Sequence, residues 1–154
     1  MTRMKLNLKR IRVEDSEAIT NILTKSFNYD TQLYFGEGAE DGPKGYDSGE
    51  IANKVLNDGS HSYLVYTEDC ELAFISVDIN KREVRYFCVL PKYIGQGYGK
   101  KIWSQMEELY GNADWIVETP SYSISNHYFY EKLGFIKTGE KSYGENAKSF
   151  MFKK

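Results

Sequence analysis

A glycine-rich segment, Gly-Gln-Gly-Tyr-Gly at residues 95–99, separates two stretches with different periodicity. It follows the apolar run 84–91, which is typical of a strand, and opens a helical stretch that ends near Tyr110. A helix N-terminus presents backbone N–H groups without intrahelical acceptors and the positive end of the helix dipole. Glycines add positive φ angles and a close approach of the backbone. The segment predicts a phosphate-binding turn, although an ordinary strand-to-helix turn can have the same spacing.

The composition bounds the class of protein that surrounds this turn. A chain of 154 residues without a linker, repeat or low-complexity segment predicts one domain over residues 1–154. The formal charge of −2 is spread over interspersed acids and bases, so we expect no nucleic-acid partner. Cys70, Cys88 and two distant histidines have no metal-site spacing, so we expect no metal. Neither a signal-peptide core nor a membrane-length apolar run is present, which predicts a cytoplasmic protein with no membrane partner.

Apolar periodicity predicts the elements that position the turn. Helices are expected from Asp15 or Ser16 to Phe27 and over residues 51–56, 98–110 and 123–133, and Gly134 caps the last one. Residues 28–50 are expected to form a glycine-rich acidic connection. Strands are expected over residues 5–12, 62–67, 72–79, 83–90, 115–117, 135–138 and 149–152. This order predicts an α/β fold with a mixed sheet.

Two of the predicted helices have apolar residues along one face only. The spacing assigns buried positions to Ile19, Ile22, Leu23 and Phe27 in the first helix, and to Tyr98, Ile102, Met106 and Leu109 in the third. Trp103 and Trp115 are interpreted as core residues. Most of the 13 tyrosines are expected at the margins of the core.

A second motif follows late in the chain, with the sequence Asn-His-Tyr-Phe-Tyr-Glu-Lys-Leu-Gly-Phe at residues 126–135. Together with the glycine turn and the order of elements, it resembles the GNAT superfamily of acyl-CoA-dependent N-acetyltransferases. The resemblance covers residues 5–152. It implies a mostly antiparallel central sheet, flanked by helices and splayed between its fourth and fifth strands.

The resemblance also implies where acetyl-CoA, the co-substrate, is held. In the family, the pantetheine arm fills the splay and bonds the backbone of the fourth strand after a bulge. The pyrophosphate lies on the amides of the turn, whose side chains matter mainly by staying out of the way. The implied contacts here are Cys88, Val89 and Leu90 for the arm, and Gly95, Gln96, Gly97, Tyr98, Gly99 and Lys100 for the pyrophosphate.

The chain departs from the family pattern at two positions. The turn begins with Ile94 where the family usually has Gln or Arg, so a polar side-chain contact is lost. Ser123 stands where the family often has Asn, and Asn126 follows within the same helix. Either Ser123 or Asn126 can hydrogen-bond the coenzyme, and the sequence does not choose between them.

The motif makes Tyr130 the expected leaving-group donor. When an amine attacks the thioester, coenzyme A leaves as a thiolate that a phenol can protonate or stabilise. Because a thiol pKa of about 8.5 lies below a phenol pKa of about 10, full proton transfer is mildly uphill. Hydrogen-bond stabilisation therefore matters as much as proton donation. The alternative is a tyrosine that only packs between Phe129 and Leu133.

An alkylammonium acceptor must lose a proton before it attacks. Glu83, at the start of the central strand, is the expected base, and Glu118 is a comparable candidate. His127 titrates in the right range but is expected to be structural, and water can also take the proton. Cys88 suggests an acyl-cysteine intermediate, but its apolar strand position favours a buried structural thiol.

These residues predict an N-acetyltransferase that works by direct attack of a primary amine on acetyl-CoA. The alternative is a non-catalytic acyl-CoA-binding module, which loss of the tyrosine would favour. A nucleotide-binding loop is disfavoured because the Walker pattern is absent and the dinucleotide pattern is one residue short.

The acceptor is expected to be a small-molecule or peptide amine. Acids interleaved with aromatic residues between positions 28 and 50 weakly favour a small cationic amine or a lysine-like group, against the alternative of a merely solvated loop. These acids are Asp30, Glu37, Glu40, Asp41, Asp47 and Glu50. The oligomeric state stays open, a homodimer included.

Overall fold

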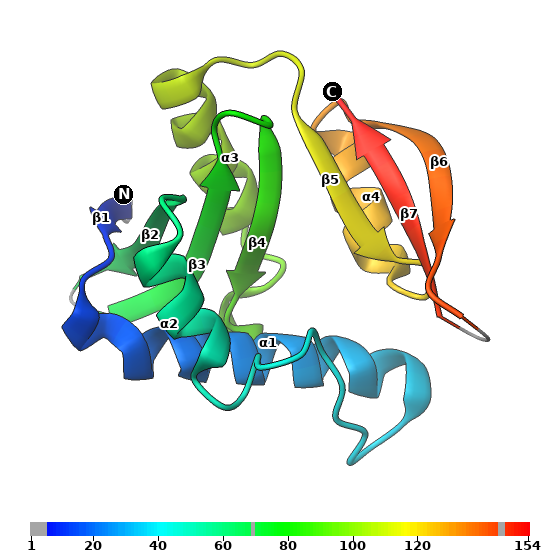
Figure 1. Ribbon diagram of the computed structural model, residues 1–154, viewed down its shortest axis with the longest axis horizontal. Coiled ribbons are helices and arrows are strands. Elements are labelled where there is room, and N and C mark those ends of the chain that lie inside the picture. Colours follow the sequence, from blue (N-terminus) through cyan, green and yellow to red (C-terminus); the bar gives the residue numbers. More distant parts are fainter. Residues whose placement is uncertain (1–5, 69, 145–146) are drawn as a thin grey trace.

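The computed structural model describes residues 6–68, 70–144 and 147–154, which form a seven-stranded sheet between two layers of helices (Figure 1). The strand order is β1-β2-β3-β4-β5-β7-β6, and only the β4–β5 pair is parallel. The predicted α/β fold with a mixed, mostly antiparallel sheet is confirmed. The strands are β1 (Leu6–Arg10), β2 (His61–Thr67), β3 (Cys70–Asp78), β4 (Glu83–Val89), β5 (Ile116–Pro120), β6 (Ile136–Ser142) and β7 (Lys148–Lys153). The helices are α1 (Ser16–Phe35), α2 (Glu50–Asn57), α3 (Tyr98–Tyr110) and α4 (Ile124–Lys132).

The sheet opens between β4 and β5. These strands share only the pairs Glu83–Ile116 and Val84–Val117, after which they diverge toward α1 (Figure 1). On its other side, β4 stays paired with β3 as far as Val89. The predicted splay between the fourth and fifth strands is therefore confirmed.

A bulge in β4 accompanies the opening. Ser76 of β3 faces Tyr86, while the next residue, Val77, faces Val84, so Arg85 is the extra residue of β4. A bulge bends its strand and increases the local twist. It thus helps to turn the end of β4 away from β5.

Two apolar cores lie on the two faces of the sheet. The core under α1 and α2 contains Ile19, Ile22, Leu23, Ile51, Val55, Phe74 and Cys88. The core under α3 and α4 contains Ile102, Trp103, Met106, Trp115, Tyr130, Phe135 and Phe152. The expected core roles of Trp103 and Trp115 are confirmed, and their rings meet edge to face with centroids 5.2 Å apart.

Helix α1 is longer than predicted. It continues to Phe35, whereas the sequence suggested a connection from Asn28, because the second half of the helix lacks an apolar stripe. This half crosses the opening between β4 and β5 (Figure 1). The amide of Ser125 donates to Tyr34 Oη at 2.9 Å, and the Phe35 ring lies 4.8 Å from that of Tyr122. The tertiary contacts on both sides of the opening stabilise a helix that local pattern alone did not predict.

Other predicted boundaries and positions need smaller corrections. Leu109, expected to be buried, is 57% exposed in the last turn of α3. The periodicity gives the face of a helix, but not how far the surface beneath it extends. Lys5, predicted to begin the first strand, lies outside the described residues. Cys70 is exposed and Cys88 is buried, and both are free thiols.

Candidate active site

The glycine turn joins the end of β4 to the N-terminus of α3. Gly95 and Gly97 have φ angles of +81° and +84°, a region that residues with a side chain rarely adopt. A Cβ built on either glycine would meet no heavy atom within 4 Å, so both positions face open space. The start of an α-helix directs backbone N–H groups outward, and here it adjoins the turn. The turn therefore has the geometry of an anion site.

Gly99 is a glycine for a different reason. A Cβ at this position would lie 2.8 Å from Cε1 of Phe129. The missing side chain lets the first turn of α3 approach the Phe129 ring of α4. The sequence assigned Gly99 to the coenzyme only, because the spacing does not reveal this packing contact.

The end of β4 has a free edge. Past Val84, no described residue of β5 pairs with β4, so backbone groups along that edge remain available for a ligand. On the opposite edge, the amide of Leu90 donates to the carbonyl of Leu72 at 2.8 Å. The predicted pantetheine contacts, Cys88 to Leu90, lie on this last part of the strand and just beyond it.

Cys88 is a buried thiol with a raised pKa. Burial is the largest cause and takes its pKa to about 12, although a hydrogen bond with Ser26 of α1 lowers it. A thiol with this pKa holds no appreciable thiolate near neutral pH. The side chain therefore fits the structural role expected from its strand position.

Thr119 was not predicted as a site residue. It lies on β5, two residues past the last pair with β4, and is 4% exposed. Within the described part of the chain, its buried hydroxyl has no hydrogen-bond partner. Such an orphan is uncommon in folded proteins, and here a hydrogen-bonding ligand in the opening can satisfy it. In the sequence, Thr119 lies just past the strand expected over residues 115–117, and no motif marks it as a site residue.

Tyr130 is 5% exposed and packs on the rings of Phe129 and Phe135, with centroids 5.2 and 5.3 Å away. Its hydroxyl bonds to none of the described residues. Burial raises the pKa of Tyr130, and Cys88 raises it further. Cys88 and Tyr130 belong to the cores on opposite faces of the sheet, yet the two groups are close enough for Cys88 to affect the pKa of Tyr130. Tyr130 is thus a protonated donor beside the opening, without a protein acceptor.

Ser123 and Asn126 lie where α4 begins. Ser123 is completely buried, and its Oγ donates to Oδ1 of Asp30 on α1 at 3.2 Å. Burial raises the pKa of Asp30, while the bond from Ser123 and the nearby His127 lower it. Asn126 is half-buried, and its side chain bonds to no residue that the structure describes. Sequence reasoning counted Asp30 among the acids of a loop and missed that it faces the opening.

The two candidate bases, Glu83 and Glu118, and the histidine expected to be structural, His127, lie in three different environments. Glu83 forms the first pair of the β4–β5 ladder, about 16 Å along the strand from Cys88 at roughly 3.3 Å per residue. Glu118 is exposed and accepts a short hydrogen bond from Tyr143, whose pKa it raises. Nε2 of His127 donates to the Pro120 carbonyl at 2.9 Å, which fits the expected structural role. The structure therefore gathers Tyr130, Cys88 and Ser123 at the opening, and Glu83 lies at its closed end.

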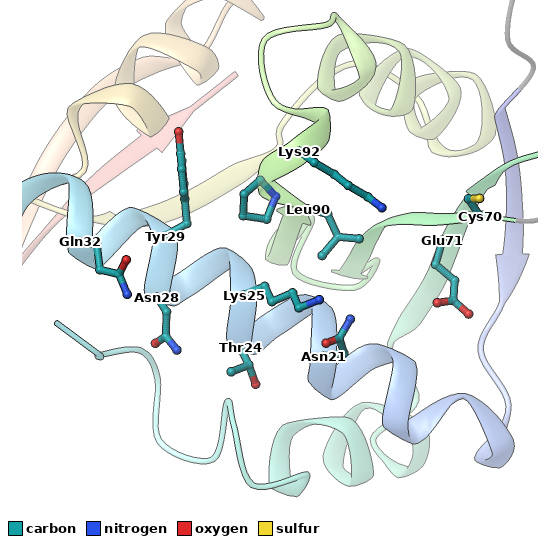
Figure 2. Close-up of a pocket in the computed structure, with 11 residues that line it drawn as sticks. Asn21, Thr24, Lys25, Asn28, Tyr29, Gln32, Cys70, Glu71, Leu90 and Lys92 are labelled. Carbon is teal, nitrogen blue, oxygen red and sulfur yellow. The ribbon is translucent and has the colours of Figure 1, made fainter. Parts of the chain in front are cut away.

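A groove of about 680 Å³ runs beside the open end of β4 (Figure 2). One wall is the face of α1 that points away from the sheet, with Lys25 and Asn28, and the other contains Leu90 and Lys92. Among the predicted coenzyme contacts, only Leu90 lines it. Lys25 and Lys92 give this groove positive charge.

The acidic connection between α1 and α2 folds back along α1. Thr31 donates from Oγ1 to the carbonyl of Asp41 at 2.9 Å, which ties the loop to the helix. Burial is the largest cause that raises the pKa of Tyr122, which precedes α4; a hydrogen bond with Thr31 lowers this pKa, and Asp30 and Asp41 raise it further. Part of the predicted acidic segment therefore lies near the rim of the opening.

Solved structures with the same arrangement are N-acetyltransferases. A GCN5-related N-acetyltransferase from Rhodopseudomonas palustris superimposes with a TM-score of 0.75 at 17% identity, over 99% of this chain and 98% of its own. The ribosomal-protein-S18-alanine N-acetyltransferase of Escherichia coli superimposes with a TM-score of 0.72 at 14% identity, over 96% of this chain and 92% of its own. Spermidine N-acetyltransferase from Vibrio cholerae, solved with CoA and spermine, superimposes with a TM-score of 0.68 at 13% identity, over 96% of this chain and 93% of its own. At these identities the likeness establishes the fold, which is that of the GNAT acetyltransferases.

The sequence itself matches the family model described as the acetyltransferase (GNAT) domain over residues 58–137, just over half of the chain. The protein therefore belongs to the GNAT acetyltransferase family. This membership confirms the resemblance, the class of enzyme and the expected co-substrate, acetyl-CoA. The chain matches no curated protein significantly. No helix in the described part of the chain has both the length and the hydrophobicity needed to cross a membrane.

Proposed function

We propose that this protein transfers an acetyl group from acetyl-CoA to a primary amine by direct attack, within a single domain. The observation that carries the proposal is the Tyr130 hydroxyl, which lies beside the opening near Cys88 and has no acceptor among the described residues. A phenol held in this way suits a leaving thiolate. The glycine turn at the open end of the same strand supplies an anion site for the other end of the coenzyme.

The coenzyme is held along β4 and over the turn. The pantetheine arm runs past the free backbone edge at Cys88, Val89 and Leu90, and the orphan hydroxyl of Thr119 supports this path. Asn126 is the better placed of the two open candidates, because the hydroxyl of Ser123 already donates to Asp30. The pyrophosphate rests on the amides of Gly95, Gln96, Gly97, Tyr98, Gly99 and Lys100.

In the chemical step, the neutral amine forms a C–N bond to the acetyl carbonyl carbon as the C–S bond breaks. The electron pair of that bond leaves on sulfur, and Tyr130 donates a hydrogen bond or its proton to the thiolate. The phenol remains protonated near neutral pH because burial raises the Tyr130 pKa. Glu83 lies at the closed end of the opening, so it can take the amine proton only through intervening water.

A small cationic amine or a lysine-like group is the proposed acceptor. Asp41 and its neighbours in the loop 36–49 give the rim of the opening negative charge, and Tyr122 adds an aromatic face. Both features favour alkylammonium groups.

Two measurements test the proposal. An acceptor screen that follows thiol release from acetyl-CoA should find an amine substrate, and mass spectrometry should find the acetylated amine. Binding of acetyl-CoA, followed by calorimetry, should be lost in Gly97→Asp through bulk and like charge. Gly59→Asp is the matched control, because Gly59 has a similar φ of +76° and equally open space.

The outcomes separate the alternatives. Undiminished acetyl-CoA affinity in folded Gly97→Asp would remove the phosphate site from the proposal. Tight acetyl-CoA binding without thiol release on any amine would favour the non-catalytic acyl-CoA-binding module instead.

A further inference from the structure

Asp30 continues the sheet-facing stripe of α1. Ile19, Leu23, Ser26 and Asp30 follow one another at spacings of three or four residues, so they share one face of the helix. Ile19 and Leu23 are buried in the core, and Ser26 hydrogen-bonds Cys88 of β4. One turn later, the same face carries a carboxylate. This position brings Asp30 to the opening, where Ser123 donates to its Oδ1.

Ser123 hydrogen-bonds this carboxylate instead of capping its own helix, α4. A serine at an N-cap normally accepts a hydrogen bond from an amide of the first turn. At the N-cap of α4, the Ser123 side chain makes no such bond and donates to Asp30 across 93 residues of sequence. The local capping bond is therefore absent, and a bond that positions a carboxylate distant in sequence is made instead. Such exceptions occur at functional sites more often than elsewhere.

Asp30 forms no ion pair with a described residue, although the charge of nearby His127 lowers its pKa. The titratable groups that face it are the Cys88 thiol from β4, the His127 ring from α4 and the Tyr122 phenol from the preceding segment. His127 already donates from Nε2 to Pro120. A half-buried carboxylate without a cationic partner is costly, and a ligand that brings a cation or a proton relieves the cost.

We propose that Asp30 is the catalytic residue that binds the acceptor ammonium and takes its proton. The inference rests on the proposed transfer to an amine. A proton moves from R–NH₃⁺ to the Asp30 carboxylate, and the freed lone pair attacks the acetyl carbon. The proton lost by nitrogen after attack replaces the one that Tyr130 gives to sulfur, and Asp30 releases its own proton to water. The products are the acetylamine, the coenzyme thiol and one proton.

Asp30→Asn is the direct test, because asparagine keeps the shape and still accepts the bond from Ser123. With an amine found in the screen, kcat/KM should fall roughly 10²-fold or more, as expected for loss of a general base. Acetyl-CoA affinity should be unchanged by calorimetry. The apparent pKa of the pH–rate profile should rise toward that of the free amine. Glu17→Gln, an exposed acid on the first turn of α1, is the matched control.

Thermal stability provides a second readout. Burial raises the Asp30 pKa above its unfolded value of 3.8, so the stability it contributes is present below pH 3.8 and is lost as pH rises through the folded pKa. Asp30→Asn should therefore melt higher than the wild type near neutral pH, and this difference should vanish toward pH 3.8. A purely structural aspartate would instead leave the variant less stable.

Three results would overturn the inference and leave the proposed function intact. These are wild-type kcat/KM and pH profile in Asp30→Asn, a shift of the apparent pKa in Glu83→Gln instead, or a lowered melting temperature in Asp30→Asn. If the wild-type protein transferred acetyl groups to no amine, the proposed function and the inference would both fall.

Discussion

Replacing Tyr130 by phenylalanine removes one oxygen atom from the opening. The ring stays in place, because its contacts with Phe129 and Phe135 are edge-to-face aromatic contacts that phenylalanine also makes. No hydrogen bond to a described residue is lost. The substitution therefore isolates the donor from the packing.

The two expected effects differ widely in size. Since no partner is left unsatisfied, the free energy of unfolding should change by less than about 1 kcal/mol. Turnover should fall by roughly 10²–10⁴-fold if the phenol supplies acid catalysis to the thiolate. At about 1.36 kcal/mol for each factor of ten, that loss is about 2.7–5.4 kcal/mol of transition-state stabilisation.

The assay is steady-state thiol release on the best amine of the screen, with calorimetry for acetyl-CoA and a melting curve. Tyr128→Phe is the matched control, because Tyr128 lies on the same helix with 60% of its surface exposed. Turnover should fall in Tyr130→Phe alone, while the Kd for acetyl-CoA stays nearly unchanged. The donor should also persist to a pH above 10, the ordinary phenol pKa, because burial raises the pKa of Tyr130.

Wild-type turnover in a folded Tyr130→Phe variant would refute the reasoning and return Tyr130 to a packing role. Loss of acetyl-CoA affinity equal to the loss of kcat/KM would refute it differently, since the hydroxyl would then act in binding.

Two further predictions concern packing and charge. Gly99→Ala should destabilise the protein by roughly 1–3 kcal/mol, because its Cβ would lie 2.8 Å from Phe129; a melting curve checks this, and Phe129→Leu should restore part of the loss. For cationic acceptors, kcat/KM should fall as ionic strength rises and fall again in Glu40→Gln/Asp41→Asn, whereas an uncharged acceptor that outcompetes every cationic amine would contradict the acidic rim.

The sequence predicted those elements that depend on local features, such as backbone conformation and apolar periodicity. The glycines of the turn need positive φ angles, so Gly95 and Gly97 were informative before the fold was known. Strands β2 and β3 run apolar because both faces of the sheet are covered there. Tyr130 could be predicted because it belongs to the motif at residues 126–135, which resembles that of the family.

The second half of α1 was missed for a physical reason. Beyond Phe27, Leu33 is 54% exposed and the other positions on this face carry Asp30 and Tyr34, so the buried apolar stripe ends. These residues contact Ser123 and Ser125 across the opening, and no local pattern encodes partners so far away along the chain. The helix is stabilised by the contacts that it makes in the fold.

Three departures from local rules lie around the opening, while a fourth, the buried Nε1 of Trp103 without a described partner, lies in the core under α3. Asp30 interrupts an apolar stripe, Ser123 does not cap its helix, and the hydroxyl of Thr119 is buried without a partner in the described chain. Each would be a defect in a protein that only had to fold. Together they surround a gap that the two-pair contact of β4 and β5 leaves open. If stability were the only requirement, apolar residues would be expected to fill this gap. The polar groups that line it are therefore better explained by the binding of a ligand than by a contribution to stability.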